Sequence, residues 1–168
     1  DKVTINTIAF KDKNFVHEAV KTFGSQCIVA SIDVKQNKKN WQVFINGGQE
    51  NTCLESLSWA YQLQDMGVGE IILNSIDRDG TGKGFDLNLI EHFRNKLRIP
   101  LIICGGAGNE QHFYDAFKKD VDAVCAGNFF HFQELSYPKT KNYLIKKNIP
   151  LRKVKLNSKF LSREPKYN

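Results

Sequence analysis

The sequence Glu70-Ile71-Ile72-Leu73-Asn74-Ser75-Ile76, near the middle of the chain, runs directly into Asp77-Arg78-Asp79-Gly80-Thr81-Gly82. The first stretch is apolar enough for a buried strand, and the second places two carboxylates and two glycines where that strand is expected to end. Such groups at the carboxyl end of a buried strand are typical of (β/α) barrels, whose chemistry lies in the loops after the strands. The stretch therefore favours a barrel-type α/β fold.

The same pattern recurs three more times along the chain. Apolar runs end in Asp33, in Cys104-Gly105-Gly106-Ala107-Gly108 and in Ala126-Gly127-Asn128. Continuous apolar strands of this kind fit a parallel sheet that helices cover on both faces. Four strands are thus expected to present polar or glycine groups at one rim.

Apolar periodicity predicts strands that alternate with helices. We expect strands near 3–7, 26–33, 69–76, 100–104 and 122–127, and helices near 14–23, 54–66, 86–97, 110–118 and 136–147. The polar segment 34–52 has the pattern of a small hairpin inserted in a loop at the rim. Five strands cannot close an eight-stranded barrel, so we predict a partial TIM (β/α)8 barrel, strands four to eight, with about three βα units expected upstream. Residues 1–150 form this barrel part, and 151–168 a C-terminal extension.

Composition limits the class of protein. With 168 residues and 41% apolar residues, the chain can bury one core. The four cysteines and four histidines lack metal-ligand spacing, so we expect reduced thiols in a cytoplasm, no metal and no cofactor. No apolar run approaches the roughly 20 residues of a membrane span, which predicts a soluble protein. The net charge of +6 is scattered without an aromatic-basic motif, which argues against nucleic-acid binding.

Two glycine-containing segments are candidates for a phosphate site. Gly105, Gly106 and Ala107 precede a predicted helix, where backbone N–H groups bind anions well, and Gly127 with Asn128 can add donors to the same anion. The alternative is that both segments are simply tight turns. The barrel context favours the phosphate site, because the last two βα loops are its usual place.

Polar residues at the other predicted strand ends suggest further roles. Asp33 is either a general acid/base or an ion-pair partner of Lys35. Asp77 and Asp79 either form a surface turn with Arg78 or face the substrate, and we favour Asp79 for the site and Asp77 for orientation. Two residues that end the first predicted strand, Asn6 and Thr7, either hold a second phosphate or cap the next helix.

These residues, in this order, resemble the cyclase subunit of imidazole glycerol phosphate synthase, the ammonia-using barrel of histidine biosynthesis. The resemblance runs over nearly all of 1–150 and is most specific in Ser75-Ile76-Asp77-Arg78-Asp79-Gly80-Thr81. It implies a lyase and cyclase that uses no cofactor. From ammonia and a bisphosphorylated ribulosyl precursor, the enzyme would form imidazole glycerol phosphate and an aminoimidazole-carboxamide ribotide. A glutaminase partner subunit would supply the ammonia.

The resemblance also implies roles for single residues. Asp33 matches one of two catalytic aspartates, and Lys2 and Glu70 match charged residues that gate the ammonia entrance. The implied substrate- and phosphate-binding residues are Asn6, Thr7, Asp77, Asp79, Gly80, Gly105, Gly106, Ala107, Gly127 and Asn128.

The chain also departs from the family pattern. It carries Cys104 and Asn128 where serine is common, and Asn74 where a threonine is common. Two alternatives therefore stay open. One is a paralogue that channels ammonia for sugar amidation in surface-polysaccharide synthesis, and the other is a non-catalytic barrel fragment that binds phosphate metabolites.

Overall fold

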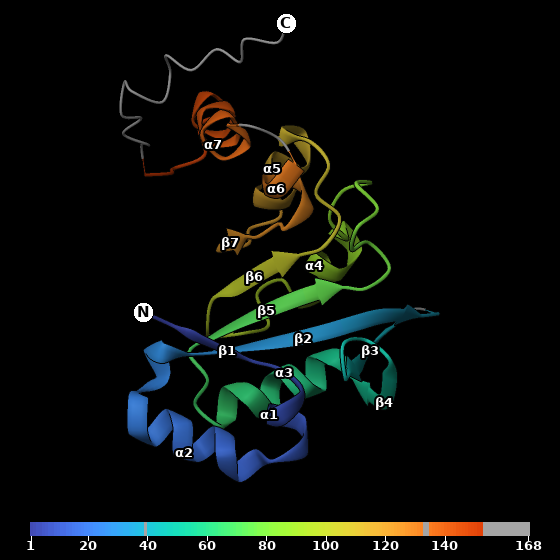
Figure 1. Ribbon diagram of the computed structural model, residues 1–168, viewed down its shortest axis with the longest axis vertical. Helices are drawn as coiled ribbons and strands as arrows, with labels where there is room; N and C mark the ends of the chain where they lie inside the picture. Colours follow the sequence, from blue (N-terminus) through green and yellow to red (C-terminus); the bar gives the residue numbers. More distant parts are fainter. Residues whose placement is uncertain (39, 133–134, 153–168) are drawn as a thin grey trace, which may run out of the picture.

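The computed structural model describes residues 1–38, 40–132 and 135–152, and its centre is a curved, mainly parallel sheet (Figure 1). The strands are β1 (Val3–Ile5), β2 (Ile28–Asn37), β3 (Asn40–Ile45), β4 (Glu50–Glu55), β5 (Glu70–Ser75), β6 (Leu101–Cys104) and β7 (Ala123–Val124). Strands β1, β2, β5, β6 and β7 pair in parallel, whereas β3 and β4 pair antiparallel as an extension of β2. The five parallel strands confirm the predicted partial barrel.

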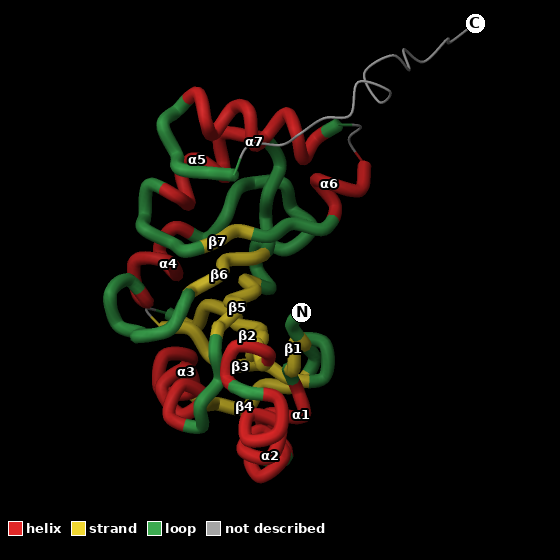
Figure 2. Tube along the Cα trace, turned by 90° about the vertical axis from the view of Figure 1, so that its left-hand side faces the viewer, coloured by secondary structure: helices red, strands yellow, loops and turns green. Residues whose placement is uncertain are grey.

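Helices follow the parallel strands. They are α1 (Thr7–Lys11), α2 (Lys13–Phe23), α3 (Ser56–Asp65), α4 (Leu87–Phe93), α5 (Glu110–Phe117), α6 (Asn128–Phe132) and α7 (Ser136–Lys146), with a 3-10 turn at Ser25–Cys27. Figure 2 shows α3, α4 and α5 along one side of the strands, with α2 and α7 at the two ends. Among the described residues, no helix is long and apolar enough to cross a membrane.

Strand β2 is longer than its sequence predicts. We expected it to end at Asp33, but it continues to Asn37 and turns into β3, so Asp33 lies inside the strand. The apolar pattern stops at Val34 because the last residues of β2 are exposed, and their backbone still pairs with β3. Strand β1 pairs with the first half of β2 and β3 with the second half, while β5 lies along the other edge.

The core lies between the sheet and its helices. Fully buried side chains include Ile32, Ile71, Leu73 and Ile103 from the strands, and further apolar side chains come from the helices, among them Val16, Leu63, Leu89, Phe93 and Phe113. Burying such a side chain contributes about 1.5–3 kcal/mol. The core therefore fixes the strands whose carboxyl ends carry the polar residues.

Two short helices were not predicted. Helices α1 and α6 each have five residues, too few to show a helical period in the sequence. The hairpin predicted within 34–52 is present as β3 and β4, but β4 extends to Glu55, and the helix expected from residue 54 begins at Ser56. Of the predicted C-terminal extension, residues 153–168 lie outside the described part of the chain.

Candidate functional site at the carboxyl ends of the strands

Three polar side chains form one row across the sheet. The register places Asp33 of β2 opposite Asn74 of β5, and Asn74 opposite Cys104 of β6. Residues opposite each other on neighbouring strands point to the same face, so the row presents a carboxylate, a carboxamide and a thiol together. Three separate strands thus build one site.

Asp33 is buried, with 8% of its surface exposed, and both of its carboxylate oxygens accept hydrogen bonds. The Asn6 Nδ2 group donates to Oδ2 at 2.9 Å, and the Asn74 Nδ2 group donates to Oδ1 at 3.0 Å. The predicted alternative, an ion pair with Lys35, is wrong, since the ion pairs among the described residues do not include Asp33. Two amides therefore hold the carboxylate in one orientation.

The structure does not support the alternative that Asn6 caps the following helix. Asn6 stands at the start of α1, but its side chain makes no capping hydrogen bond and is directed to Asp33 instead. The Thr7 Oγ1 atom accepts from the Asn46 backbone N–H at 2.9 Å and so ties α1 to the end of β3. Their role at a second phosphate stays a prediction.

The loop after β5 is joined to the end of β2 and to β3 of the hairpin. The Asp77 carboxylate accepts from the Gln36 backbone N–H at 2.8 Å. The Trp41 Nε1 group donates to the buried Asp86 carboxylate at 3.2 Å. Hydrogen bonds to charged groups contribute about 1.5–3 kcal/mol, so the hairpin and the loop are held together. The Asp77 carboxylate thus fixes the loop after β5, and its role toward a substrate stays a prediction.

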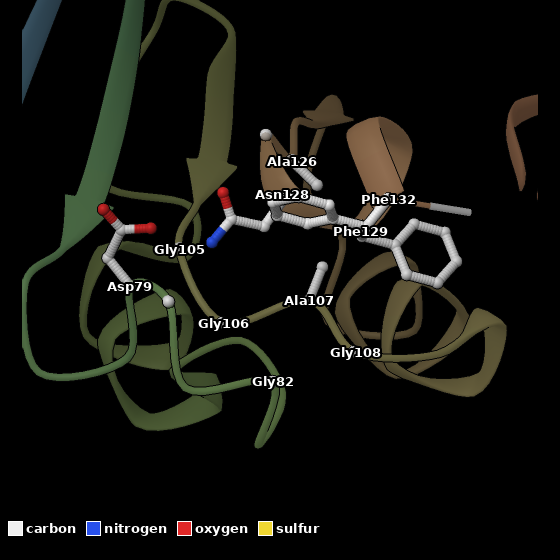
Figure 3. Close-up of a pocket in the computed structure, with 12 residues that line it drawn as sticks. Asp79, Gly82, Gly105, Gly106, Ala107, Gly108, Ala126, Asn128, Phe129 and Phe132 are labelled. Atoms are coloured by element: carbon white, nitrogen blue, oxygen red, sulfur yellow. The ribbon is translucent and has the colours of Figure 1, made fainter.

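A pocket of about 210 Å³ lies beside this loop. Figure 3 shows the side chains of Asp79 and Asn128 directed toward each other across the chain at Gly105, with Phe129 and Phe132 at the far side. The lining residues are Asp79, Gly80, Gly82, Gly105, Gly106, Ala107, Gly108, Ala126, Gly127, Asn128, Phe129 and Phe132. The two glycine-containing segments predicted to share an anion therefore meet in one pocket, with Asp79 beside them.

The glycines of this pocket also allow close packing between two loops. A Cβ atom on Gly106 would lie 2.3 Å from the carbonyl oxygen of Gly84, and one on Gly108 would lie 2.1 Å from that of Gly82. The Gly84 N–H group donates to the Gly106 carbonyl at 2.7 Å. The tight-turn alternative thus explains part of the glycine content.

Backbone donors remain in the same loops. Within the described part of the chain, the N–H groups of Gly106, Ala107 and Gly127 have no hydrogen-bond acceptor. In contrast, the Gly108 N–H group donates to His112 Nδ1 at 3.1 Å. Unpaired backbone N–H groups that line a concave surface are the donors that bind phosphate. The pocket can therefore accept an anion.

Known proteins provide an independent view of this site. A family model described as histidine biosynthesis protein matches residues 1–136. The chain belongs to that family. The resemblance found in the sequence is thereby confirmed, and the five parallel strands with their helices are the part of the family's barrel that this chain contains.

Curated relatives in the histidine biosynthesis protein family are imidazole glycerol phosphate synthase subunits HisF. Those of Hydrogenobaculum sp. (strain Y04AAS1), Pyrobaculum aerophilum and Campylobacter concisus (strain 13826) are 44%, 43% and 45% identical to this chain over 154, 152 and 152 residues. Each alignment covers 90% of this chain, but 61%, 60% and 60% of the relative. The chain thus spans about 60% of the length of the relatives it matches.

The two residues predicted to gate ammonia, Lys2 and Glu70, lie at the opposite end of the strands. Lys2 immediately precedes β1 and forms an ion pair with Glu70, the first residue of β5. The pair is therefore separated from Asp33 by the length of the parallel strands. This is the placement that the predicted gate requires, and its role in ammonia passage stays a prediction.

Two residues that belong to the site were not predicted from the sequence. Asn74 and Cys104 stood out only as departures from the family pattern, but they share a row with Asp33. A carboxamide inside an apolar strand was the available signal for Asn74, because a buried amide needs partners. For Cys104 the sequence held no such signal, since a half-buried cysteine also suits an apolar strand.

Proposed function

We propose that this chain forms part of an ammonia-dependent lyase and cyclase of histidine biosynthesis. The reaction converts a bisphosphorylated ribulosyl aminoimidazole-carboxamide precursor and ammonia into imidazole glycerol phosphate and an aminoimidazole-carboxamide ribotide. The pocket that joins Asp79 to the unpaired N–H groups of Gly106, Ala107 and Gly127 is the observation that carries this proposal. The names of the curated relatives support the same reaction.

Phosphate anchoring supplies the orientation in this mechanism. One phosphate of the precursor binds to the backbone donors at Gly105, Gly106, Ala107, Gly127 and Asn128. The other binds near Asn6 and Thr7, across the mouth. Fixing both ends holds the reacting carbons in one place, which converts an encounter in solution into an intramolecular reaction. Asp79 and Gly80, beside the first anchor, position the substrate, and Asp77 holds their loop against the hairpin.

Asp33 transfers protons in the proposed mechanism. Its carboxylate is held by Asn6 and Asn74 while it moves protons during ammonia attack, bond cleavage and ring closure. Ammonia reaches it from a glutaminase partner that docks at the Lys2 and Glu70 end of the strands.

A turnover assay of the protein that the whole gene encodes, with ammonia and the bisphosphate precursor, tests this proposal. We expect ammonia-dependent consumption of the bisphosphate precursor, and a loss of at least about a hundredfold in Asp33→Asn, the range of a general acid/base group. Asp65→Asn is the matched control, because Asp65 is a largely exposed residue at the end of α3. Equal turnover by Asp33→Asn and the wild-type protein would contradict the role of Asp33.

The paralogue remains the second candidate, and specific residues favour it. Asn74, Cys104 and Asn128, which the resemblance marks as departures from the family pattern, lie at the row and the pocket. In this case the protein passes ammonia to a sugar amidotransferase and does not cleave the bisphosphate precursor. A folded protein that binds inorganic phosphate but gives no turnover of the precursor would support this candidate over the cyclase.

A further inference from the structure

Two cysteines lie at the carboxyl ends of neighbouring strands, Cys104 at the end of β6 and Cys125 directly after β7. Strands β6 and β7 pair Ile102 with Ala123 and Ile103 with Val124, so the next position in this register sets Cys104 opposite Cys125. The Cys125 backbone N–H donates to the Ile103 carbonyl at 2.9 Å, which continues the parallel pairing to this point. Neighbouring strands lie about 4.8 Å apart. That spacing falls within the Cα separation of about 4.4–6.8 Å that a disulfide spans.

The two thiols affect each other's ionisation. The neighbouring Cys125 thiol lowers the pKa of Cys104, whereas burial and the charges of Asp79 and Asp33 raise it. The neighbouring Cys104 thiol and burial raise the pKa of Cys125. Cys104 is therefore the member of the pair that more readily forms a thiolate. Both cysteines are free and only partly buried.

We propose that Cys104 and Cys125 form a reversible disulfide whose closure changes the anion pocket. Each cysteine immediately precedes one of the two pocket segments, Gly105–Gly108 and Ala126–Asn128. Sulfur atoms in a disulfide are about 2.05 Å apart, much closer than two thiols in contact. Closure therefore turns both side chains toward each other and links the starts of the two segments covalently, which restrains the backbone N–H groups that line the pocket between them.

The oxidant is a low-molecular-weight disulfide such as oxidised glutathione. The Cys104 thiolate attacks one of its sulfur atoms, forms a mixed disulfide and releases one glutathione thiolate. The Cys125 thiol then gives up its proton and attacks the Cys104 sulfur, which breaks the mixed disulfide and releases the second glutathione. Two protein thiols are oxidised, one glutathione disulfide is reduced to two thiols, and the two cysteine protons pass to the released glutathione.

Peptide mapping of the whole protein tests the linkage. The protein is equilibrated with oxidised glutathione, alkylated and cleaved after Lys and Arg, which places the four cysteines in four different peptides. We expect the peptides 99–118 and 120–139 to be joined and to separate on reduction. Cys125→Ser should instead retain glutathione on Cys104, because the resolving thiol is gone. Exposed Cys53 is the internal control, and it should carry glutathione without joining another cysteine.

Phosphate titration tests the consequence for the pocket. We expect the disulfide form to bind inorganic phosphate at least about threefold more weakly, with full recovery after reduction, and Cys104→Ser to be insensitive to the oxidant. The proposal would be overturned if Cys104 and Cys125 stay reduced while Cys53 is modified. It would also be overturned if Cys104 and Cys125 each carry a glutathione and are not linked to each other. An unchanged phosphate affinity after disulfide formation would overturn the claim that the disulfide changes the pocket. A reduced protein that binds no phosphate would count against the proposed function instead, because the peptide map decides the disulfide independently.

Discussion

Replacing Gly106 by alanine tests how the anion pocket is built. Gly106 has a φ of 104°, a backbone conformation that other residues rarely adopt. A Cβ atom at this position would lie 2.3 Å from the Gly84 carbonyl oxygen. That oxygen belongs to the backbone, and Gly84 is also bound to Gly106 by a 2.7 Å hydrogen bond, so the clash cannot be relieved by a side-chain rotation. Gly106→Ala should therefore destabilise the protein.

Two costs add at this position. A residue in a sparsely populated backbone conformation costs about 1–3 kcal/mol. Forcing an extra carbon into a packed site costs about 1–3 kcal/mol more. The expected loss is thus roughly 2–6 kcal/mol out of a total of about 5–15 kcal/mol for a typical protein. For a chain of this size, each kcal/mol lowers Tm by about 2–4 °C.

Two further glycines of the same pocket separate these costs. Gly80 has a φ of 73°, but a Cβ atom there would meet nothing within 4 Å, so Gly80→Ala should lose only about 1–2 kcal/mol from the backbone conformation. Gly127 has no positive φ and open space around it, so Gly127→Ala should be neutral or slightly stabilising. Denaturant unfolding of the three variants measures the series. A Gly106→Ala variant as stable as Gly127→Ala would refute the reasoning.

Three further predictions concern the helices and the hairpin. Trp41→Phe removes the hydrogen-bond donor to buried Asp86. Denaturant unfolding should show that the free energy of unfolding falls by about 1.5–3 kcal/mol. An unchanged midpoint would mean that this hydrogen bond does not hold the hairpin. Asn109→Ala removes the side chain that caps α5 and should cost about 1 kcal/mol in the same assay, against little effect for the neighbouring substitution Glu110→Gln. Burial raises the pKa of Glu55, but hydrogen bonds from two backbone N–H groups and His92 bring it below its ordinary value of 4.5. Ionised Glu55 therefore stabilises the protein above pH 4.5, and this stabilisation is lost as the pH falls through the lowered pKa. Because this carboxyl is partly exposed, Glu55→Gln should lower the unfolding free energy by less than about 1 kcal/mol at pH 7, and the difference should vanish in acid; a difference that grows in acid would contradict the sign.

The order of strands and helices was predictable because burial leaves a direct pattern in the sequence. The apolar run at Ile71–Leu73 had to be covered on both faces, and this requirement led to a parallel sheet and a partial barrel. The hairpin was predictable for a similar reason, since Trp41, Val43 and Ile45 alternate and are all buried. Asn46 and Gly47 then turn the chain with positive φ angles.

The arrangement within the site was less predictable because it depends on register. Asp33 was recognised, but the partners of its carboxylate lie 27 residues before it and 41 residues after it. Nothing local to Asp33 indicates that Asn6 and Asn74 are these partners. The same is true of Cys104 and Cys125, which become neighbours only when β6 and β7 align. Contact between separate strands is set by tertiary packing, and the sequence of one strand does not contain it.

The continuous path of β2 determines how the hairpin can move. Since one unbroken strand runs from the sheet through Asp33 into the hairpin, bending the hairpin must also twist the backbone that carries the carboxylate. A flexible loop would absorb such a displacement, whereas β2 is one continuous strand that pairs with β1, β3 and β5 and transmits it. Any molecule that presses on the hairpin therefore changes the orientation of the Asp33 carboxylate, the group for which we propose proton transfer.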